Sequence, residues 1–139
     1  MDGRGDVFLV DTSVWIEVFR PGGRTALDRI ADFDELVTCL PVVQEVLQGF
    51  RDEGAFRKAK EAMAAMPIVE APLDDEVYYE AVDLYRAARR AGITVRSSVD
   101  CLIAACALRH DLTVLHRDRD YTALATICPL SSRDFPVRN

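Results

Sequence analysis

The stretch Val7-Phe8-Leu9-Val10-Asp11-Thr12-Ser13 decides the fold that this sequence predicts. Its first four residues form a continuous apolar run of strand-forming side chains, which is typical of a strand buried on both faces. The last three favour the N-terminal cap of a helix. Val14–Phe19 follows as a short helical pattern that stops at Pro21. The pattern therefore predicts a buried strand that leads directly into a helix.

Short strands and helices alternate along the rest of the chain. We expect strands over Glu35–Cys39, Ile68–Glu70 and Thr113–His116. We expect helices over Thr25–Phe33, Val42–Phe50, Phe56–Met66, Asp75–Ala91, Val99–Leu108 and Tyr121–Ala125. Alternation without hairpin turns predicts an α/β fold with a parallel sheet covered by helices. We expect one domain over residues 1–139, with residues 1–5 as a flexible tail.

Composition limits the classes of function. The 139 residues are 50% hydrophobic, which is enough for a core that needs no disulfides or metal to hold it. Seventeen basic and 23 acidic residues give a net charge of −6, which excludes a protein that coats nucleic acid by charge alone. A nuclease that builds a local site from carboxylates remains open.

Cysteine usage and the N-terminus favour a cytoplasmic protein. The four cysteines form no CxxC pair and only two histidines exist, so we expect no structural zinc. The start Met1–Asp6 lacks the apolar segment of a signal peptide. The longest uncharged apolar run, Cys101–Leu108, is too short to span a membrane.

Acidic residues stand where the predicted strands end and where two apolar helices begin. Asp11 follows the first strand, and Asp118 and Asp120 follow the last. Glu45 and Asp100 occupy the first turns of two helices that should begin at the same edge. Ligands of open parallel sheets bind beyond the carboxyl ends of the strands, so the pattern predicts that these acids meet in one site.

Each acid also has a structural explanation. Asp11 would cap the helix that follows it, and Asp120 would cap the last predicted helix. Asp100 stands three residues after Ser97, which is the spacing of a capping box. Glu45 would lie on a solvated helix face. Taken together these explanations are weaker, because Asp100 and Glu45 lie within hydrophobic stretches, where a carboxylate needs a partner.

Converging carboxylates require a cation. Two unit charges about 4 Å apart repel by about 4 kcal/mol at an effective dielectric constant of about 20. Three or four carboxylates would therefore become protonated or move apart without a positive ion between them. With oxygen ligands alone, Mg²⁺ or Mn²⁺ is the fitting ion.

Four segments carry a resemblance to a known family. They are Val10-Asp11-Thr12-Ser13-Val14-Trp15-Ile16-Glu17, Pro41-Val42-Val43-Gln44-Glu45-Val46-Leu47-Gln48-Gly49, Val99-Asp100-Cys101-Leu102-Ile103-Ala104-Ala105 and His116-Arg117-Asp118-Arg119-Asp120-Tyr121. In this order and spacing they resemble a PIN domain and, more narrowly, the VapC-type toxins of bacterial toxin–antitoxin pairs. The resemblance covers nearly the whole chain. It implies a three-layer α/β sandwich whose central, mostly parallel sheet is covered by helices.

The resemblance implies a magnesium-dependent endoribonuclease. Carried over by position, the catalytic and metal-binding acids are Asp11, Glu45, Asp100 and Asp118. Asp120 matches a further acid of many members and belongs to the expected metal set. The alternative is a catalytically silent PIN-like module that only binds.

The same resemblance implies roles around the metal. Mg²⁺ held by Asp11 and Asp100 would activate a water and neutralise charge on the phosphate. Glu45 and Asp118 would complete its shell through waters or hold a second ion when the substrate binds. Thr12 or Ser13 supplies a hydroxyl to a carboxylate or to a water at the metal. Tyr121 stands where the family often has phenylalanine, a change from which we expect little.

Basic and apolar residues suggest partners. Between Arg86 and Arg119, seven arginines stand against three aspartates, and Arg96 and Arg117 are the candidates to bind RNA phosphates. The resemblance implies a cognate VapB-type antitoxin and a homodimer. A candidate apolar groove for the antitoxin comprises Phe50, Phe56, Met63 and Met66, for which ordinary core packing is the alternative.

Other α/β enzymes with an acid after the first strand fit less well. A phosphotransfer receiver needs a lysine after a late strand, but the only lysines are Lys58 and Lys60. A haloacid-dehalogenase-like phosphatase needs an aspartate where Ser13 stands. A dinucleotide-binding fold needs a glycine-rich turn after the first strand, and Asp11–Val14 contains no glycine.

Overall fold

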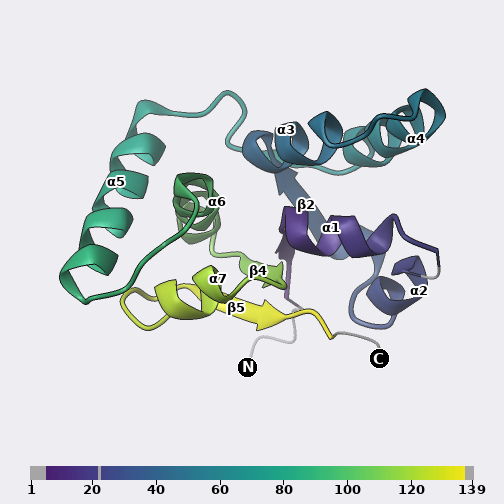
Figure 1. Cartoon of the computed structure of the whole chain (residues 1–139). Helices are drawn as coiled ribbons and strands as arrows, with labels where there is room; N and C mark the ends of the chain where they lie inside the picture. Colours follow the sequence, from purple (N-terminus) through teal and green to yellow (C-terminus); the bar gives the residue numbers. More distant parts are fainter. Residues whose placement is uncertain (1–5, 22, 137–139) are drawn as a thin grey trace.

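A five-stranded sheet forms the centre of the protein (Figure 1). The computed structural model describes residues 6–21 and 23–136, so the predicted tail over residues 1–5 lies outside the described part. The strands are β1 (Phe8–Val10), β2 (Leu36–Cys39), β3 (Ile68–Val69), β4 (Thr113–His116) and β5 (Ser131–Asp134). Their order is β3-β2-β1-β4-β5, and every pair is parallel.

Seven helices connect these strands. They are α1 (Thr12–Val18), α2 (Gly23–Asp28), α3 (Leu40–Gln48), α4 (Glu53–Ala64), α5 (Asp75–Arg90), α6 (Ser98–Arg109) and α7 (Arg119–Leu124). The chain runs outward from β1 in both directions, so right-handed crossovers place helices on both faces of the sheet. The α5–α6 pair lies to one side of the strands and α1–α2 to the other (Figure 1). Within the described residues, no helix combines the length and apolar character needed to cross a bilayer.

The order in which strands are added to the sheet reverses between β1 and β4. β1 pairs with β2 on one side and with β4 on the other, in the register Leu9 to Val37 and Leu9 to Val114. Such a switch point leaves a crevice at the carboxyl ends of the two strands. Asp11 follows β1 and Arg117 follows β4 at this point, so the fold places both segments at one edge.

The core surrounds the two central strands. Leu9, Val10, Val114 and Leu115 have no exposed surface, which explains why both strands are continuous apolar runs. Helix α6 is buried along Ile103–Ala107. Four of these five residues are alanine or cysteine, and their small side chains let the helix backbone pack closely within the core.

Two parts of the chain differ from the sequence-based expectation. The helix predicted over Thr25–Phe33 ends at Asp28, because Asp32 starts a separate turn in which the Glu35 carboxylate accepts the Asp32 N–H at 2.8 Å. Strand β5 was not predicted, because its sequence Ser131–Asp134 is polar and largely exposed. The fully parallel sheet confirms the predicted α/β class, and β4 has the predicted bounds.

Candidate active site

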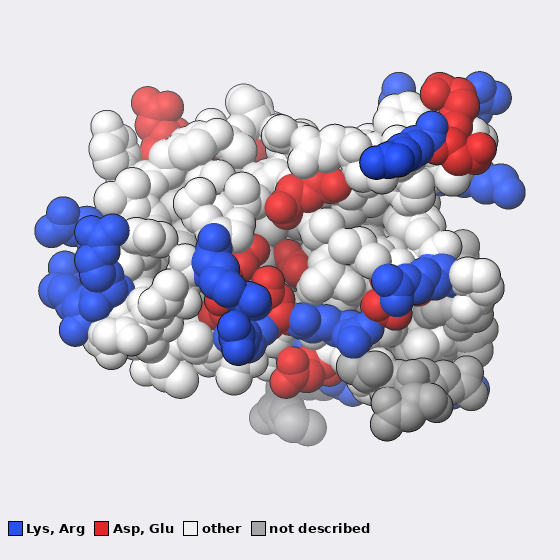
Figure 2. All heavy atoms as spheres, in the orientation of Figure 1, with Lys and Arg blue, Asp and Glu red and all other residues white. Residues whose placement is uncertain are grey.

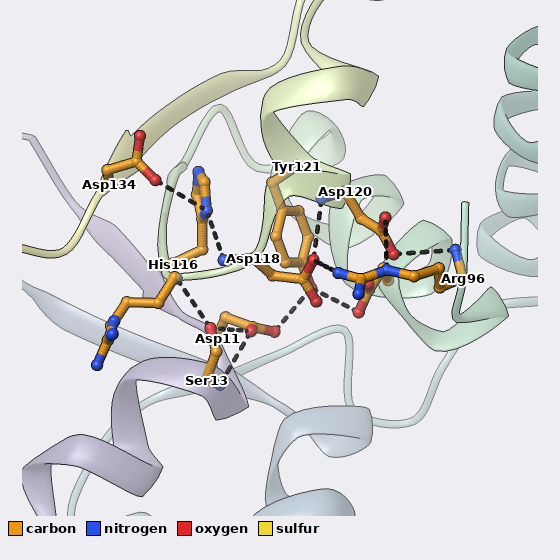
Figure 3. Close-up of polar contacts among 10 residues, drawn as sticks. Asp11, Ser13, Arg96, His116, Asp118, Asp120, Tyr121 and Asp134 are labelled. Carbon is orange, nitrogen blue, oxygen red and sulfur yellow. Dashed lines mark hydrogen bonds and ion pairs between the residues drawn. The ribbon is translucent and has the colours of Figure 1, made fainter. Parts of the chain in front are cut away.

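The five predicted acids come from four segments and lie at the switch-point edge. Asp11 precedes α1, Glu45 lies on α3, Asp100 is in the first turn of α6, and Asp118 and Asp120 start α7. Acidic side chains lie in the middle of the face shown in Figure 2, with basic side chains beside them. Figure 3 shows the contacts that join most of these segments.

Both oxygens of the Asp11 carboxylate are held by hydrogen bonds. Its Oδ2 accepts the backbone N–H of Ser13 at 3.0 Å and the Ser13 hydroxyl at 2.6 Å. Its Oδ1 accepts the hydroxyl of Tyr121 at 2.7 Å. The predicted capping role of Asp11 is therefore confirmed. The cap also fixes the carboxylate in its buried position.

Asp100 does not form the capping box suggested by its spacing from Ser97. Ser97 is the N-cap residue of α6 but makes no capping hydrogen bond through its side chain. The carboxylate of Asp100 is instead 5% exposed and lies with its Oδ1 3.2 Å from the Tyr121 hydroxyl. Its Oδ2 is buried and has no hydrogen-bond partner among the described residues. Burial, together with the neighbouring carboxylates of Asp120 and Asp11, raises the pKa of Asp100 to about 8.

Asp100, Asp118 and Asp120 form a compact group. One carboxylate oxygen of each lies within 4.8 Å of the others. Asp118, not Asp120, caps α7, because its Oδ1 accepts the Asp120 N–H at 2.9 Å. Asp120 instead accepts the backbone N–H of Arg96 at 3.0 Å. Its side chain is thereby turned toward the group and is almost fully buried.

Glu45 joins the site through a hydroxyl. The hydroxyl of Thr12 donates to Glu45 Oε1 at 2.9 Å. Burial raises the pKa of Glu45, the hydrogen bond from Thr12 opposes this, and the negative charges of Asp11 and Asp118 raise the pKa further. The negative charges of the other acids therefore act on Glu45. Its side chain is partly buried, so it is not the solvated surface residue of the alternative explanation.

The two arginines predicted to bind phosphate are paired with carboxylates. Arg96 Nη2 lies 3.0 Å from Asp118 Oδ1, and its Nε lies 3.6 Å from Asp120 Oδ1. Arg117 Nη1 lies 2.8 Å from a carboxylate oxygen of Glu17. The guanidinium of Arg96 is 55% exposed and therefore remains accessible to a ligand. The Arg117 backbone N–H donates to the Ser13 hydroxyl at 2.9 Å.

Two side chains of the site were not predicted from the sequence. Tyr121 is fully buried, and its hydroxyl contacts both Asp11 and Asp100, so its difference from phenylalanine is larger than we expected. His116 is also buried, and its ring lies 5.1 Å from that of Tyr121. Burial lowers the pKa of His116. The available signal was that both residues flank the Asp118 and Asp120 pair in the sequence.

The donor set fits a hard divalent cation. The compact group offers carboxylate oxygens alone, which suit Mg²⁺ and Mn²⁺. The Oδ2 of Asp100 independently indicates a cation. A buried carboxylate oxygen without a hydrogen-bond donor destabilises the fold unless a cation contacts it. Asp11 lies next to this group through the shared contact with Tyr121.

The predicted apolar groove is only partly present. Met63 and Met66 are buried in the core, which confirms the alternative for these two residues. Phe50 lines a hollow of about 320 Å³. Its other lining residues, from α1, α3 and the ends of these helices, are Ile16, Phe19, Arg20, Glu45, Val46 and Gly49. The hollow therefore ends at one of the site acids.

The chain is similar to known proteins over nearly its whole length. The PIN domain model matches residues 8–127. Ribonuclease VapC11 of Mycobacterium tuberculosis is 36% identical over 135 residues, which cover 93% of this chain and 99% of that protein. VapC ribonuclease Mb1587 of Mycobacterium bovis gives the same values. The chain therefore belongs to the PIN-domain family, among the VapC ribonucleases.

Solved structures support the same fold at much lower identity. DNA-bound VapBC from Salmonella typhimurium matches with a TM-score of 0.74 and 14% identity, covering 95% of this chain and all of that one. VapBC-1 from nontypeable Haemophilus influenzae matches with a TM-score of 0.72 and 15% identity, covering 92% and 97% of the two chains. The resemblance to a three-layer PIN fold is thereby confirmed.

Proposed function

We propose that this chain is a magnesium-dependent endoribonuclease that acts in the cytoplasm as the toxin of a type II toxin–antitoxin pair. The observation that carries the proposal is the group of three carboxylates within 4.8 Å, one of which keeps a buried oxygen without a donor. The 36% identity to VapC ribonucleases, in matches that cover 93% of the chain, supports RNA as the substrate.

The proposed site residues are metal ligands or residues that position these ligands. Asp11 and Asp100 hold the ion, and Asp118 and Asp120 extend the acidic shell. A bound Mg²⁺ or Mn²⁺ supplies Lewis acidity, since it lowers the pKa of a water and neutralises charge that develops on the phosphate. Glu45, held by Thr12 on the side of α3, would complete the shell of the ion through a water.

Hydroxyl groups and one arginine complete the proposed mechanism. Thr12 fixes the Glu45 carboxylate and Ser13 fixes that of Asp11. Arg96 pairs with the acids in the absence of substrate, and its exposed guanidinium binds a phosphate of the RNA. Arg117 is the second phosphate contact, on the side of α1.

The decisive test compares Asp11→Asn with the wild-type protein. Without a charged ligand at this position we expect RNA cleavage to fall by ~100-fold or more, since even partners outside the metal shell change activity by 10–100-fold. Gel analysis of a labelled RNA in Mg²⁺ measures the rate. Asp34→Asn changes an exposed carboxylate in the same way and serves as the control. Cleavage by Asp11→Asn at the wild-type rate contradicts the proposal.

The alternative, a catalytically silent binding module, makes a different prediction. Such a module has no carboxylate-dependent affinity for Mg²⁺ or Mn²⁺. Titration calorimetry of the wild-type protein and of Asp11→Asn therefore separates the two functions without an RNA substrate. The presence of all five acids at one edge favours the enzyme.

We propose that a segment of a VapB-type antitoxin occupies the hollow between α1 and α3. The hollow is lined by apolar side chains such as Ile16, Phe19 and Phe50, and it reaches Glu45. A segment bound there would cover the approach to the acids as well as bury its own apolar residues. A complex that forms equally well with Phe50→Asp contradicts this placement.

We propose a homodimer through the outer face of α5. Tyr78, Tyr79 and Val82 are 49%, 72% and 53% exposed on this helix, which is a large apolar surface for one element. The helix carries acidic residues in its first turn and Arg89 and Arg90 in its last. Antiparallel pairing of two copies therefore brings opposite charges together around the apolar centre. Val82→Asp should convert the dimer to a monomer in light-scattering measurements.

A further inference from the structure

We infer that Tyr121 is a positioning residue whose hydroxyl holds Asp11 and Asp100 at the spacing that a divalent cation requires. The inference rests on the proposed function, because it assigns the metal to these two carboxylates. It goes beyond that function by giving a role to a side chain that contacts neither the RNA nor the metal.

The hydroxyl of Tyr121 joins two carboxylates that are far apart in the sequence. It lies 2.7 Å from Asp11 Oδ1 and 3.2 Å from Asp100 Oδ1. Asp11 follows β1 and Asp100 starts α6, and in the described part of the chain these two carboxylates share no other hydrogen-bonding side chain. Figure 3 shows the tyrosine side chain directed toward Asp11 at the centre of the site. Ser13 fixes Asp11 from one side, and the Tyr121 oxygen is the side-chain group that links Asp11 to Asp100.

The ring that carries the hydroxyl is itself fixed. Tyr121 has no exposed surface, and its ring packs against His116 with the centroids 5.1 Å apart. The His116 Nδ1 accepts the backbone N–H of Asp118 at 3.2 Å, which ties this second ring to the turn before α7. The Tyr121 backbone N–H donates to the Asp118 carbonyl at 3.2 Å. The hydroxyl is thus held at a defined point rather than on a mobile side chain.

Counting acceptor sites shows which oxygens this arrangement leaves for a cation. A carboxylate oxygen has two lone pairs. Those of Asp11 Oδ2 are both used by Ser13, whereas Asp11 Oδ1 accepts only Tyr121 and keeps one. Asp100 Oδ2 keeps both, because it has no partner among the described residues. Tyr121 has one hydroxyl hydrogen, which the nearer Asp11 Oδ1 accepts at 2.7 Å, and Asp100 Oδ1 makes the longer contact of 3.2 Å with the same oxygen. A free lone pair therefore remains on both carboxylates.

Packing alone does not explain a tyrosine at this position. Phenylalanine fills nearly the same volume and contains no polar group to remove from water. A fully buried hydroxyl is unfavourable unless it is hydrogen-bonded, and here both of its side-chain partners are proposed metal ligands. The contacts with the two carboxylates, and not packing in the core, therefore explain the hydroxyl at this position.

The test is Tyr121→Phe, which removes one oxygen and keeps the ring against His116. We expect Mn²⁺ to bind 10–100-fold more weakly in titration calorimetry of the whole chain, the range found when a partner of a metal ligand is removed. Tyr85→Phe removes a hydroxyl from a tyrosine of α5, away from the acids, and should bind Mn²⁺ as the wild type does. Thermal unfolding of the metal-free proteins verifies that both variants are folded.

Kinetics distinguish positioning from a structural role. For Tyr121→Phe we expect kcat for RNA cleavage to fall at limiting Mn²⁺ and to return to within threefold of wild type at saturating Mn²⁺, with KM for RNA unchanged. A merely structural defect would not be rescued by the ion. Affinity for Mn²⁺ within twofold of wild type, or a loss of kcat that Mn²⁺ does not restore, overturns the inference. Absence of Mn²⁺ binding by the wild type would instead overturn the proposed function.

Discussion

Carboxylates form two clusters in this protein, and the two clusters differ in the groups that balance their negative charge. On one side Arg109 contacts Glu70, Glu76 and Glu80 at 2.8, 3.4 and 3.2 Å, and His110 contacts Glu70 at 2.9 Å. We call this the Arg109 cluster. At the candidate active site, five acids converge, and the cation in contact with them is the half-exposed Arg96.

The pKa values of carboxylates in the two clusters are shifted from their ordinary values in opposite directions. Hydrogen bonding and charge from Arg109, with a further contribution from His110, lower the pKa of Glu70. Burial raises the pKa of Asp100 and of Glu45. An acidic cluster by itself therefore says little about metal binding. The informative feature is a group of buried acids whose charge the protein leaves largely uncompensated.

The largest expected difference concerns pH and Asp100. Metal-free native protein keeps a proton on Asp100 up to a pKa of about 8, whereas the unfolded chain releases it near the ordinary value of 3.8. The native state therefore binds more protons between these values. Asp100 should lower the free energy of unfolding by up to ~1.4 kcal/mol for each unit of rising pH in this window.

Asp100→Asn removes this contribution. In urea unfolding with a chelator at pH 5.5, 6.5 and 7.5, the variant should gain stability relative to wild type as the pH rises. Asp34→Asn, with its exposed carboxylate, should follow the wild-type slope. Parallel slopes for wild type and Asp100→Asn would show that burial does not hold a proton on this group.

The Arg109 cluster should behave in the opposite way. Because the pKa of Glu70 is lowered in the native state, the cluster stabilises the fold above about pH 4.5 and loses this effect as the pH falls through the folded-state value. Glu70→Gln should therefore lower the free energy of unfolding by about 1 kcal/mol at pH 7 and by much less at pH 3. Glu61→Gln on the exposed side of α4 is the matched control. An equal loss at both pH values contradicts the ion-pair origin.

The smallest expected effect tests the partial compensation by Arg96. Its removal leaves Asp118 and Asp120 without their cation, so Arg96→Gln should bind Mn²⁺ about two- to fivefold more tightly, as expected for loss of an exposed ion pair worth about 0.5–1 kcal/mol. The same change should raise KM for RNA, because it removes a proposed phosphate contact. Calorimetry measures the first effect, with Arg57→Gln as the control. Weaker Mn²⁺ binding by Arg96→Gln would mean that the arginine supports the metal site instead of competing with it.

The sequence predicted the features that depend on local pattern. Strand β4 has the predicted bounds, and the apolar runs around Leu9 and Val114 identified the two central strands. The proximity of Asp100, Asp118 and Asp120 also followed from the pattern, because residues that end parallel strands or start the following helices share one edge. Glu45 differs, because α3 begins at Leu40 and places it beyond the first turn. Asp11 in addition caps α1 as predicted.

The features that were missed depend on tertiary contacts. Strand β5 consists of polar residues and exists because it pairs with β4 at an exposed edge. The contact of Tyr121 with Asp11 spans 110 residues, so no spacing rule reveals it. The spacing of Asp100 from Ser97 predicted a capping box. In the structure the Asp100 carboxylate is buried and lies near the other acids instead. Such choices become visible only once the helices are packed.

The dispersal of the acid set along the chain has a consequence for biosynthesis. Asp11 and Glu45 are translated early, but Asp100, Asp118, Asp120 and the Tyr121 hydroxyl all come from the last third of the chain. A nascent polypeptide that ends before this segment has an incomplete set of ligands, however well its first strands are folded. The set of carboxylates is therefore complete only after most of the chain has been made.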